Sequence, residues 1–162
     1  MKLYRLFIIV ILAVVITGCG ITSTDHENAI MDGIASLNRG KPEKALESFE
    51  RAVELDPQDA TGYLGRANAL NTIGKWERSL ADYNRALDLD PNLTNAYVNR
   101  GIAYAHLGEA KKAIADYEKA LVLDPKIDNS PTFIKRLFSN EPNTDKGIRK
   151  HLEALKKQVS SG

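Results

Sequence analysis

The sequence predicts an all-α fold, an α-α superhelix in which three helix-turn-helix units stack side by side and a C-terminal helix caps the stack. The first observation is a tripeptide, Leu-Asp-Pro, that recurs every 34 residues, at 55–57, 89–91 and 123–125. The second is a set of glycines with the same spacing, namely Gly40, Gly74 and Gly108. Repeats of this length are typical of solenoids built from helical pairs.

Helical periodicity within each unit is the third observation. In the first unit, apolar residues recur at helical spacing at Ala45, Leu46, Phe49, Ala52 and Val53. Proline ends this helix because it lacks an amide donor and disfavours helical geometry in the residue before it. The glycine in the middle of each unit fits a left-handed residue just after the first helix. Each unit is therefore predicted to be a helix, a tight turn and a second helix.

These landmarks resemble the tetratricopeptide repeat, or TPR. The resemblance divides the chain into units at 26–59, 60–93 and 94–127, followed by capping helices in 128–162. The third unit carries the residue types usual for the family, at Tyr97, Gly101, Tyr104, Ala113, Tyr117, Ala120 and Pro125. The first unit departs, with Ala29 and Ser36 where aromatic residues are usual, as terminal units of a solenoid often do. The cap is predicted from the apolar stripe formed by Ile148, Leu152, Leu155 and Val159.

A short apolar leader precedes the repeats. Residues 6–16 are apolar without interruption and follow two basic residues, Lys2 and Arg5. Eleven residues form a helix of about 16 Å, roughly half of the ~30 Å hydrocarbon core of a membrane. The layout is therefore typical of a cleavable secretory signal rather than of a transmembrane helix.

The single cysteine follows this leader in the sequence Ile-Thr-Gly-Cys at residues 16–19. This motif resembles the lipobox of bacterial lipoproteins, which implies cleavage after Gly18 and lipid attachment to Cys19. Residues 1–18 would then be the signal peptide and 19–25 a lipidated tether, and several acyl chains would anchor the protein stably. The alternative is a free thiol after an uncleaved anchor. Gly20 stands where an aspartate would favour inner-membrane retention, so the resemblance favours the periplasmic face of the outer membrane in a Gram-negative source.

The TPR resemblance also implies a binding site, because ligands of the family lie in a concave groove lined by the first helices. The residues of this chain that match such positions and that we select as candidates are Asn68, Asn99, Asn71, Ile34, Leu64, Val98 and Ile102. Asparagine offers both a donor and an acceptor to a peptide backbone. The alternative is that these asparagines hydrogen-bond neighbouring helices. No matched groove position is basic, so we expect no clamp for a terminal carboxylate.

Charge is distributed unevenly along the chain. The segment beyond Pro125 has eight basic and four acidic residues, whereas the repeats have an acidic excess. The basic residues of the last helix that could touch an anionic surface weakly are Lys146, Arg149, Lys150, Lys156 and Lys157. A solvated face of the capping helix is the alternative interpretation. Without its leader the chain carries one more acidic than basic residue, which gives no electrostatic basis for binding nucleic acid.

No catalytic motif accompanies the repeats. His26, His106 and His151 fall in three different elements without metal-ligand spacing, and no nucleophile motif or phosphate-binding glycine loop is present. The sequence therefore predicts a non-enzymatic adaptor or scaffold of the bacterial cell envelope, without a cofactor, that binds a protein or peptide partner. The alternative is a structural subunit of a membrane-associated secretion or pilus-assembly complex.

Overall fold

A computed structural model describes residues 24–127 and 147–161 of the chain, and within these residues every regular element is a helix. The seven helices span residues 24–38, called the N-terminal helix below, and then α2 (Pro42–Leu55), α3 (Ala60–Thr72), α4 (Trp76–Leu89), α5 (Thr94–His106), α6 (Ala110–Leu123) and α8 (Ile148–Ser161). The predicted all-α helical repeat is confirmed. The leader, Cys19 and Lys146 lie outside the described residues. Residues 24 and 25 are already helical, so the first helix begins two residues before the predicted start of the first unit at residue 26.

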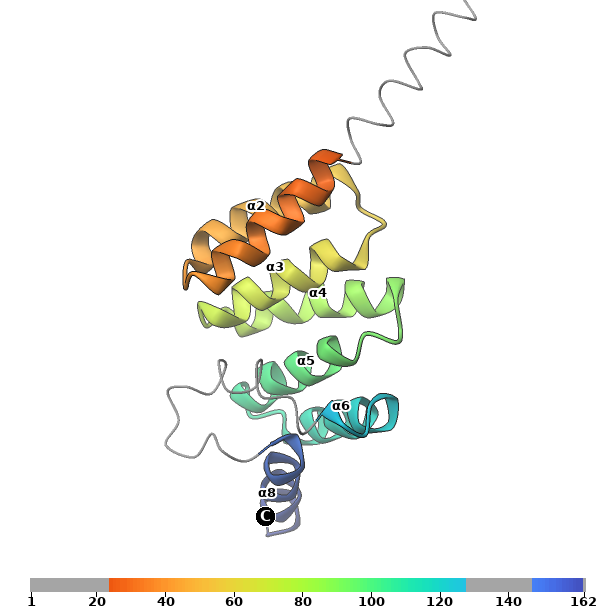
Figure 1. Ribbon diagram of the computed structural model, residues 1–162. Helices are drawn as coiled ribbons and strands as arrows, with labels where there is room; N and C mark the ends of the chain where they lie inside the picture. Colours follow the sequence, from red (N-terminus) through yellow and green to blue (C-terminus); the bar gives the residue numbers. More distant parts are fainter. Residues whose placement is uncertain (1–23, 128–146, 162) are drawn as a thin grey trace, which may run out of the picture.

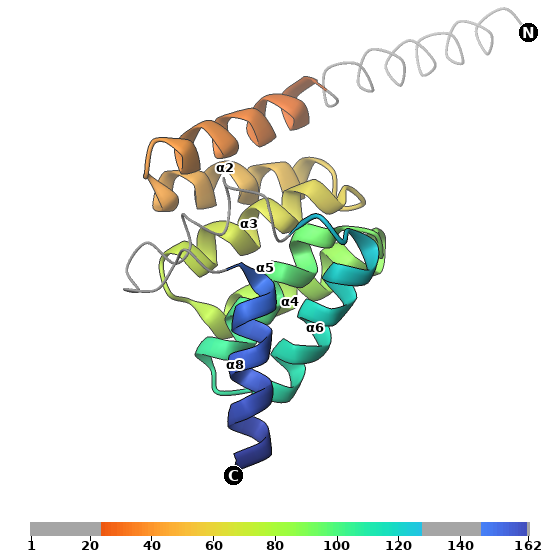
Figure 2. The same cartoon turned by 60° about the horizontal axis from the view of Figure 1, so that its bottom comes forward.

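Consecutive helices pack against one another in antiparallel pairs, and the pairs stack in chain order (Figure 1). Within a repeat, α3 packs on α4 and α5 on α6, whereas α2 with α3 and α4 with α5 form the junctions between repeats. The last helix, α8, packs on α6 and lies across the end of the stack (Figure 2). The described chain is therefore a short solenoid with a helical cap at its C-terminal end.

The repeated glycines and aspartates explain where the helices end. Gly40, Gly74 and Gly108 have φ angles of 69°, 75° and 75°, a left-handed conformation that favours glycine and lets the chain reverse between the two helices of a repeat. After each second helix, the aspartate of Leu-Asp-Pro accepts a hydrogen bond from the backbone N–H two residues later; the donors are Gln58, Asn92 and Lys126, each at 2.9 Å. This side-chain turn, together with the proline, ends the helix.

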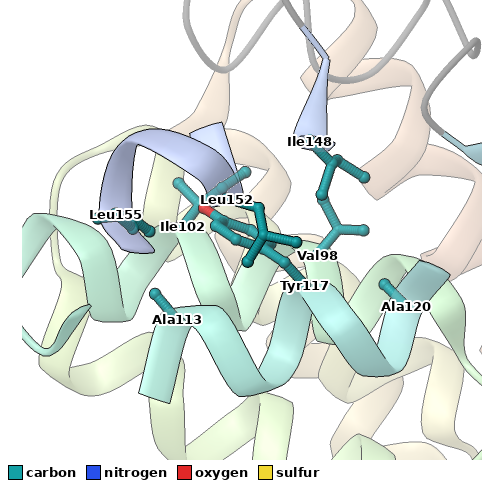
Figure 3. Close-up of a cluster of buried hydrophobic side chains, with 8 residues drawn as sticks. All are labelled: Val98, Ile102, Ala113, Tyr117, Ala120, Ile148, Leu152 and Leu155. Carbon is teal, nitrogen blue, oxygen red and sulfur yellow. The ribbon is translucent and has the colours of Figure 1, made fainter. Parts of the chain in front are cut away.

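One aromatic side chain forms the centre of each repeat. Phe49, Tyr83 and Tyr117 occupy equivalent positions on α2, α4 and α6, and each is at most 1% exposed. In the last repeat, Ile148, Leu152 and Leu155 of α8 lie over Tyr117 and shield it from solvent (Figure 3). The stripe predicted from the sequence thus caps the core, except that Val159 at the end of α8 is 37% exposed.

Two ion pairs connect the helices within the second and third repeats. Arg66 of α3 donates to both carboxylate oxygens of Asp82 on α4, at 2.8 and 2.7 Å. Arg100 of α5 makes the same forked contact with Asp116 of α6, again at 2.8 and 2.7 Å. The two aspartates are largely buried, and the paired arginine compensates the charge that burial would otherwise penalise. Sequence reasoning did not identify these pairs, although both share the same 16-residue spacing.

No helix in residues 24–127 or 147–161 combines the length and the apolar character that crossing a membrane requires.

Candidate functional site

The structure divides the seven predicted groove residues into a buried set and an accessible set. The buried side chains, none more than 2% exposed, are Asn71, Val98, Asn99 and Ile102. The accessible ones are Ile34, which is 41% exposed, and Leu64 and Asn68, which are partly buried. Only the second set can contact a ligand without rearrangement of the repeats.

The three asparagines belong to one hydrogen-bonded network between α3, α4 and α5. Asn99 Nδ2 donates to Asn68 Oδ1 at 2.7 Å, which joins the third repeat to the second. The Tyr83 hydroxyl donates to the same Asn68 oxygen at 2.9 Å. Asn71 Nδ2 donates to the backbone carbonyl of Asn99 at 3.2 Å, and Asn71 Oδ1 accepts from the Ser79 hydroxyl. In the structure the three asparagines therefore hydrogen-bond neighbouring helices, which was the alternative interpretation of the sequence.

The network fixes the orientation of the Asn68 amide. Its oxygen accepts two hydrogen bonds, from Tyr83 and Asn99, so the acceptor side of the amide is occupied. The structure gives Asn68 Nδ2 no acceptor among the residues that it describes. Burial, and next the negative charge of Asp82, raise the pKa of Tyr83 well above its ordinary value, so the hydroxyl remains a donor. Asn68 can therefore offer a ligand a donor rather than a donor and an acceptor together.

Asn99 connects the third repeat to the second and does not lie on the surface. Its side chain is fully buried, and its Oδ1 has no hydrogen-bond partner among the described residues. An unpaired buried acceptor typically costs about 1–3 kcal/mol, so this oxygen offsets part of what the network contributes. Asn99 and Asn71 are therefore too buried for direct contact with a ligand in this arrangement.

The capping helix accounts for the burial of the two apolar candidates on α5. Val98 and Ile102 lie in one cluster with Ile148, Leu152 and Leu155 of α8, as Figure 3 shows. The sequence placed α8 at the end of the stack but gave no indication that it would also cover these two residues. The accessible candidates among the seven therefore all lie in the first two repeats.

Apolar side chains characterise this accessible part, and none of its matched positions carries a basic residue. Met31, which also matches a groove position of the family, is 65% exposed on the N-terminal helix, one turn before Ile34. Leu64 and Asn68 stand one turn apart on α3, in the second repeat. A surface of this composition suits apolar side chains and uncharged backbone groups of a partner.

The basic residues of the cap have partners within the protein. Lys156 forms an ion pair with Glu118 of α6 at 2.9 Å, and the Arg149 guanidinium donates to the carbonyl of Pro125 at 3.1 Å. Lys150 also has an interaction of its own, and Lys157 is exposed. Part of the basic cluster is therefore already engaged in contacts within the protein.

Each histidine lies at a boundary between structural units. His26 contacts Asp59 at the start of α3, His106 stacks on Trp76 of α4 with ring centroids 4.0 Å apart, and the His151 ring faces Tyr117. Sequence reasoning placed the three histidines in different elements but did not detect these contacts, because each joins residues that are distant along the chain. Across residues 24–127 and 147–161, no cluster of three or more His, Cys, Asp or Glu side chains is arranged to hold a metal ion.

Two family models described as tetratricopeptide repeat match the chain, one at residues 31–94 and the other at 71–142. Together they extend over more than half of the 162 residues. The chain belongs to the tetratricopeptide repeat family, a helical scaffold that is typically non-catalytic. No curated protein matches it.

Solved structures of TPR domains resemble this chain in fold. The TPR domain of Arabidopsis OM64 has a TM-score of 0.69 and 25% identity, with 84% of this chain and 98% of that chain covered. The second TPR of Spaghetti (RPAP3), bound to the HSP90 peptide SRMEEVD, has a TM-score of 0.61 and 28% identity, covering 65% and 99%. YrrB, described as a TPR protein with an unusual peptide-binding site, has a TM-score of 0.58 and 26% identity, covering 62% and 52%.

Proposed function

We propose that this protein is a non-catalytic adaptor that binds an extended segment of a partner protein on the accessible face of its first two repeats. The proposal adds that lipid on Cys19 anchors it in the bacterial cell envelope. Similar structures hold peptides, including the RPAP3 domain bound to an HSP90 peptide. The observation that carries the proposal is the Asn68 amide, which Tyr83 and Asn99 hold with its donor group free.

The chemistry of this face defines the partner segment. Asn68 Nδ2 can donate to a backbone carbonyl, which every peptide offers, and Ile34 and Leu64 can bury apolar side chains of the segment. An acidic peptide that ends in a free carboxylate lacks a cationic partner at these positions. We therefore propose an internal, uncharged segment as the ligand, in contrast to the acidic HSP90 peptide of the RPAP3 structure.

Substitution of Asn68 by aspartate tests this site while keeping an acceptor for the two hydrogen bonds that hold residue 68. The carboxylate retains an oxygen that can accept from Tyr83 and Asn99 but replaces the free donor by a second acceptor. We expect crosslinking in cells, followed by purification and mass spectrometry, to capture a partner with the native chain and not with Asn68→Asp. Asn28→Asp is the matched control, because it makes the same charge change at an exposed position of the N-terminal helix.

The outcomes distinguish a failure of the proposed binding site from a failure of the proposed adaptor function. Loss of a partner from Asn68→Asp alone, at equal abundance and equal helicity, supports the proposed face. Equal capture by all three proteins would show that partners bind elsewhere, and would remove Asn68 from the site. Tight binding of an acidic C-terminal peptide in calorimetry would contradict the proposed ligand chemistry.

The anchor requires a separate experiment, because Cys19 lies outside the described residues. We expect the native chain to incorporate labelled palmitate, to lose residues 1–18 and to fractionate with membranes, with the outer membrane favoured in a Gram-negative host. Cys19→Ser should abolish labelling and release the protein from the membrane fraction. Retention of residues 1–18 in the mass spectrum of the native protein would contradict the proposal.

A weak contact of the cap with anionic surfaces remains a secondary part of the proposal. Lys157 is exposed, whereas Lys156 and Arg149 already have partners in the fold. Binding of the unlipidated Cys19→Ser chain to anionic vesicles should therefore be weak and should disappear as salt is raised. Binding that is independent of salt would exclude an electrostatic contact.

A further inference from the structure

The His26 ring is held between two oxygen atoms at the junction of the first and second repeats. Its Nδ1 lies 3.0 Å from the backbone carbonyl oxygen of Ala52, near the end of α2. Its Nε2 lies 2.8 Å from Oδ2 of Asp59, the residue that precedes α3. The His26 side chain is only 12% exposed. The imidazole thus connects the N-terminal helix to α2 and to the start of the second repeat.

Only the doubly protonated ring satisfies both contacts. A carbonyl oxygen accepts and never donates, so the contact with Ala52 needs a hydrogen on Nδ1. The contact with Asp59 needs a hydrogen on Nε2 as long as that carboxylate is ionised. A neutral imidazole has a hydrogen on only one of its two ring nitrogens. Either neutral tautomer therefore turns the lone pair of the other nitrogen toward an oxygen and loses one of the two hydrogen bonds.

Asp59 is held in its ionised form by other groups. Its second oxygen accepts hydrogen bonds from both the backbone N–H and the hydroxyl of Thr61, at 3.0 and 2.9 Å, and so caps α3. Burial by itself would raise the pKa of Asp59, but the hydrogen bonds from Thr61 and His26 outweigh burial and lower it. The carboxylate therefore remains an acceptor for His26 at neutral pH.

We propose that His26 and Asp59 form a pH-sensitive clasp, which locks the N-terminal helix onto the second repeat when His26 is protonated and releases this contact when it is neutral. The charged groups that act on His26 from the α2–α3 connection are Asp59 and Asp56, and on its own helix the neighbours in sequence are Asp25 and Glu27. All four are acidic, and the charges of Asp59 and Asp56 favour the imidazolium.

The direction of the pH dependence follows from the two pKa values. Burial opposes the charge on His26, but the hydrogen bonds to Asp59 and Ala52 and the acidic neighbours raise its pKa above the ordinary 6.5. The stabilisation is therefore complete below the unfolded-state pKa of His26 and is lost as pH rises through the higher folded-state value. The lowered pKa of Asp59 sets the acid limit, because the clasp is lost as pH falls through that value.

The clasp is specific to this junction. At the next junction the equivalents of His26 and Asp59 are Ala60 and Leu93, whose apolar side chains cannot form this contact, and Leu93 precedes α5 without a side-chain cap. Leu93 packs instead against the apolar cluster around Tyr83. The general architecture of the repeats therefore does not require the His26–Asp59 contact, which is a feature of the first repeat alone.

Two measurements on the full chain test the clasp. We expect NMR titration to give a His26 pKa above 6.5, with both ring nitrogens protonated at pH 6, and we expect Asp59→Ser to lower it. Serine retains a capping oxygen for Thr61 and removes only the carboxylate. Hydrogen exchange in the first turns of the N-terminal helix, corrected for intrinsic rates, should be slower relative to the rest of the chain at pH 6 than at pH 8.

His26→Gln should abolish this difference in protection, and His106→Gln should retain it, because the His106 ring stacks on Trp76 at a different junction. A His26 pKa at or below 6.5 would overturn the proposal. Protection of the N-terminal helix that does not depend on pH in the native chain, or that depends on pH equally in His26→Gln, would overturn it as well.

Discussion

The two junctions between repeats join equivalent helices by different chemistry. Between the first and second repeats, the phenyl ring of Phe49 lies against Gly65, and an added Cβ at Gly65 would overlap that ring. Between the second and third repeats, the hydroxyl of Tyr83 bonds to Asn68, which in turn accepts from Asn99. At the first junction an apolar ring thus fills the space that Gly65 leaves by having no side chain, called the glycine notch below. At the second junction an amide network makes the contact.

The residues at each junction match one another. Phe49 is equivalent to Tyr83, Gly65 to Asn99, and Ile34 to Asn68, each pair being 34 residues apart. The hydroxyl occurs where both neighbouring positions carry asparagine, whereas the phenyl ring occurs where they carry isoleucine and glycine. A buried hydroxyl needs a hydrogen-bond partner, which Asn68 supplies for Tyr83 and His151 for Tyr117. The two junctions thus place an aromatic ring in the same position and surround it with different chemistry.

The largest effect is expected at the apolar junction. Phe49→Ala removes a ring that is 1% exposed, and should lower the free energy of unfolding by about 3–5 kcal/mol. Urea denaturation followed by circular dichroism measures this loss. Phe49→Leu, which fills more of the space, should lose clearly less, and equal losses for the two variants would show that the ring is not closely packed.

A Cβ at the glycine notch should have the next largest effect. Gly65→Ala places a methyl group inside the space of the Phe49 ring, and overpacking of this kind costs about 1–3 kcal/mol. The same denaturation experiment applies. Combined with Phe49→Leu, the substitution should cost less than the sum of the two single changes, since the smaller side chain leaves room for the methyl group. Strict additivity would contradict the proposed overlap.

The polar junction should respond more weakly to loss of its hydroxyl. Tyr83→Phe removes one donor from Asn68 Oδ1, which still accepts from Asn99, and should cost about 0.5–1.5 kcal/mol. Because the ring itself stays, the m-value should not change. A loss as large as that of Phe49→Ala would mean that the network, rather than the aromatic ring, dominates this junction.

The smallest effect is expected at the cap. Lys156 and Glu118 form an ion pair between α8 and α6, but both side chains are exposed and solvent screens their attraction. Lys156→Ala should leave Tm unchanged, whereas Leu152→Ala, which removes a buried contact with the Tyr117 cluster, should lower it. Equal shifts for the two variants would indicate that charge rather than apolar packing holds the cap.

The repeat pattern predicted most of the fold because its landmarks act locally. Gly40 adopts positive φ where the turn was expected, and Asp56 with Pro57 ends α2 at the predicted place. Such features depend on residues only a few positions apart. The predicted capping by α8 also agrees with the structure, because an amphipathic stripe must cover an apolar surface.

The candidate site was less predictable than the fold. Family positions selected Asn68, which is partly accessible in the structure, and also Asn99 and Asn71, which are buried. Their burial depends on how closely neighbouring repeats approach each other. No pattern within one repeat encodes that distance.

The sequence by itself determined the helical class, the 34-residue period, the turns and the existence of a cap, because these follow from periodicity and backbone preferences over short distances. Only the tertiary structure decided which face remains open, because α8 covers Val98 and Ile102 from more than 40 positions away. It also decided that His26 meets Asp59, and that the Asn68 amide presents its nitrogen. Contacts between residues distant along the chain depend on the packing of whole helices, which local sequence preferences do not specify.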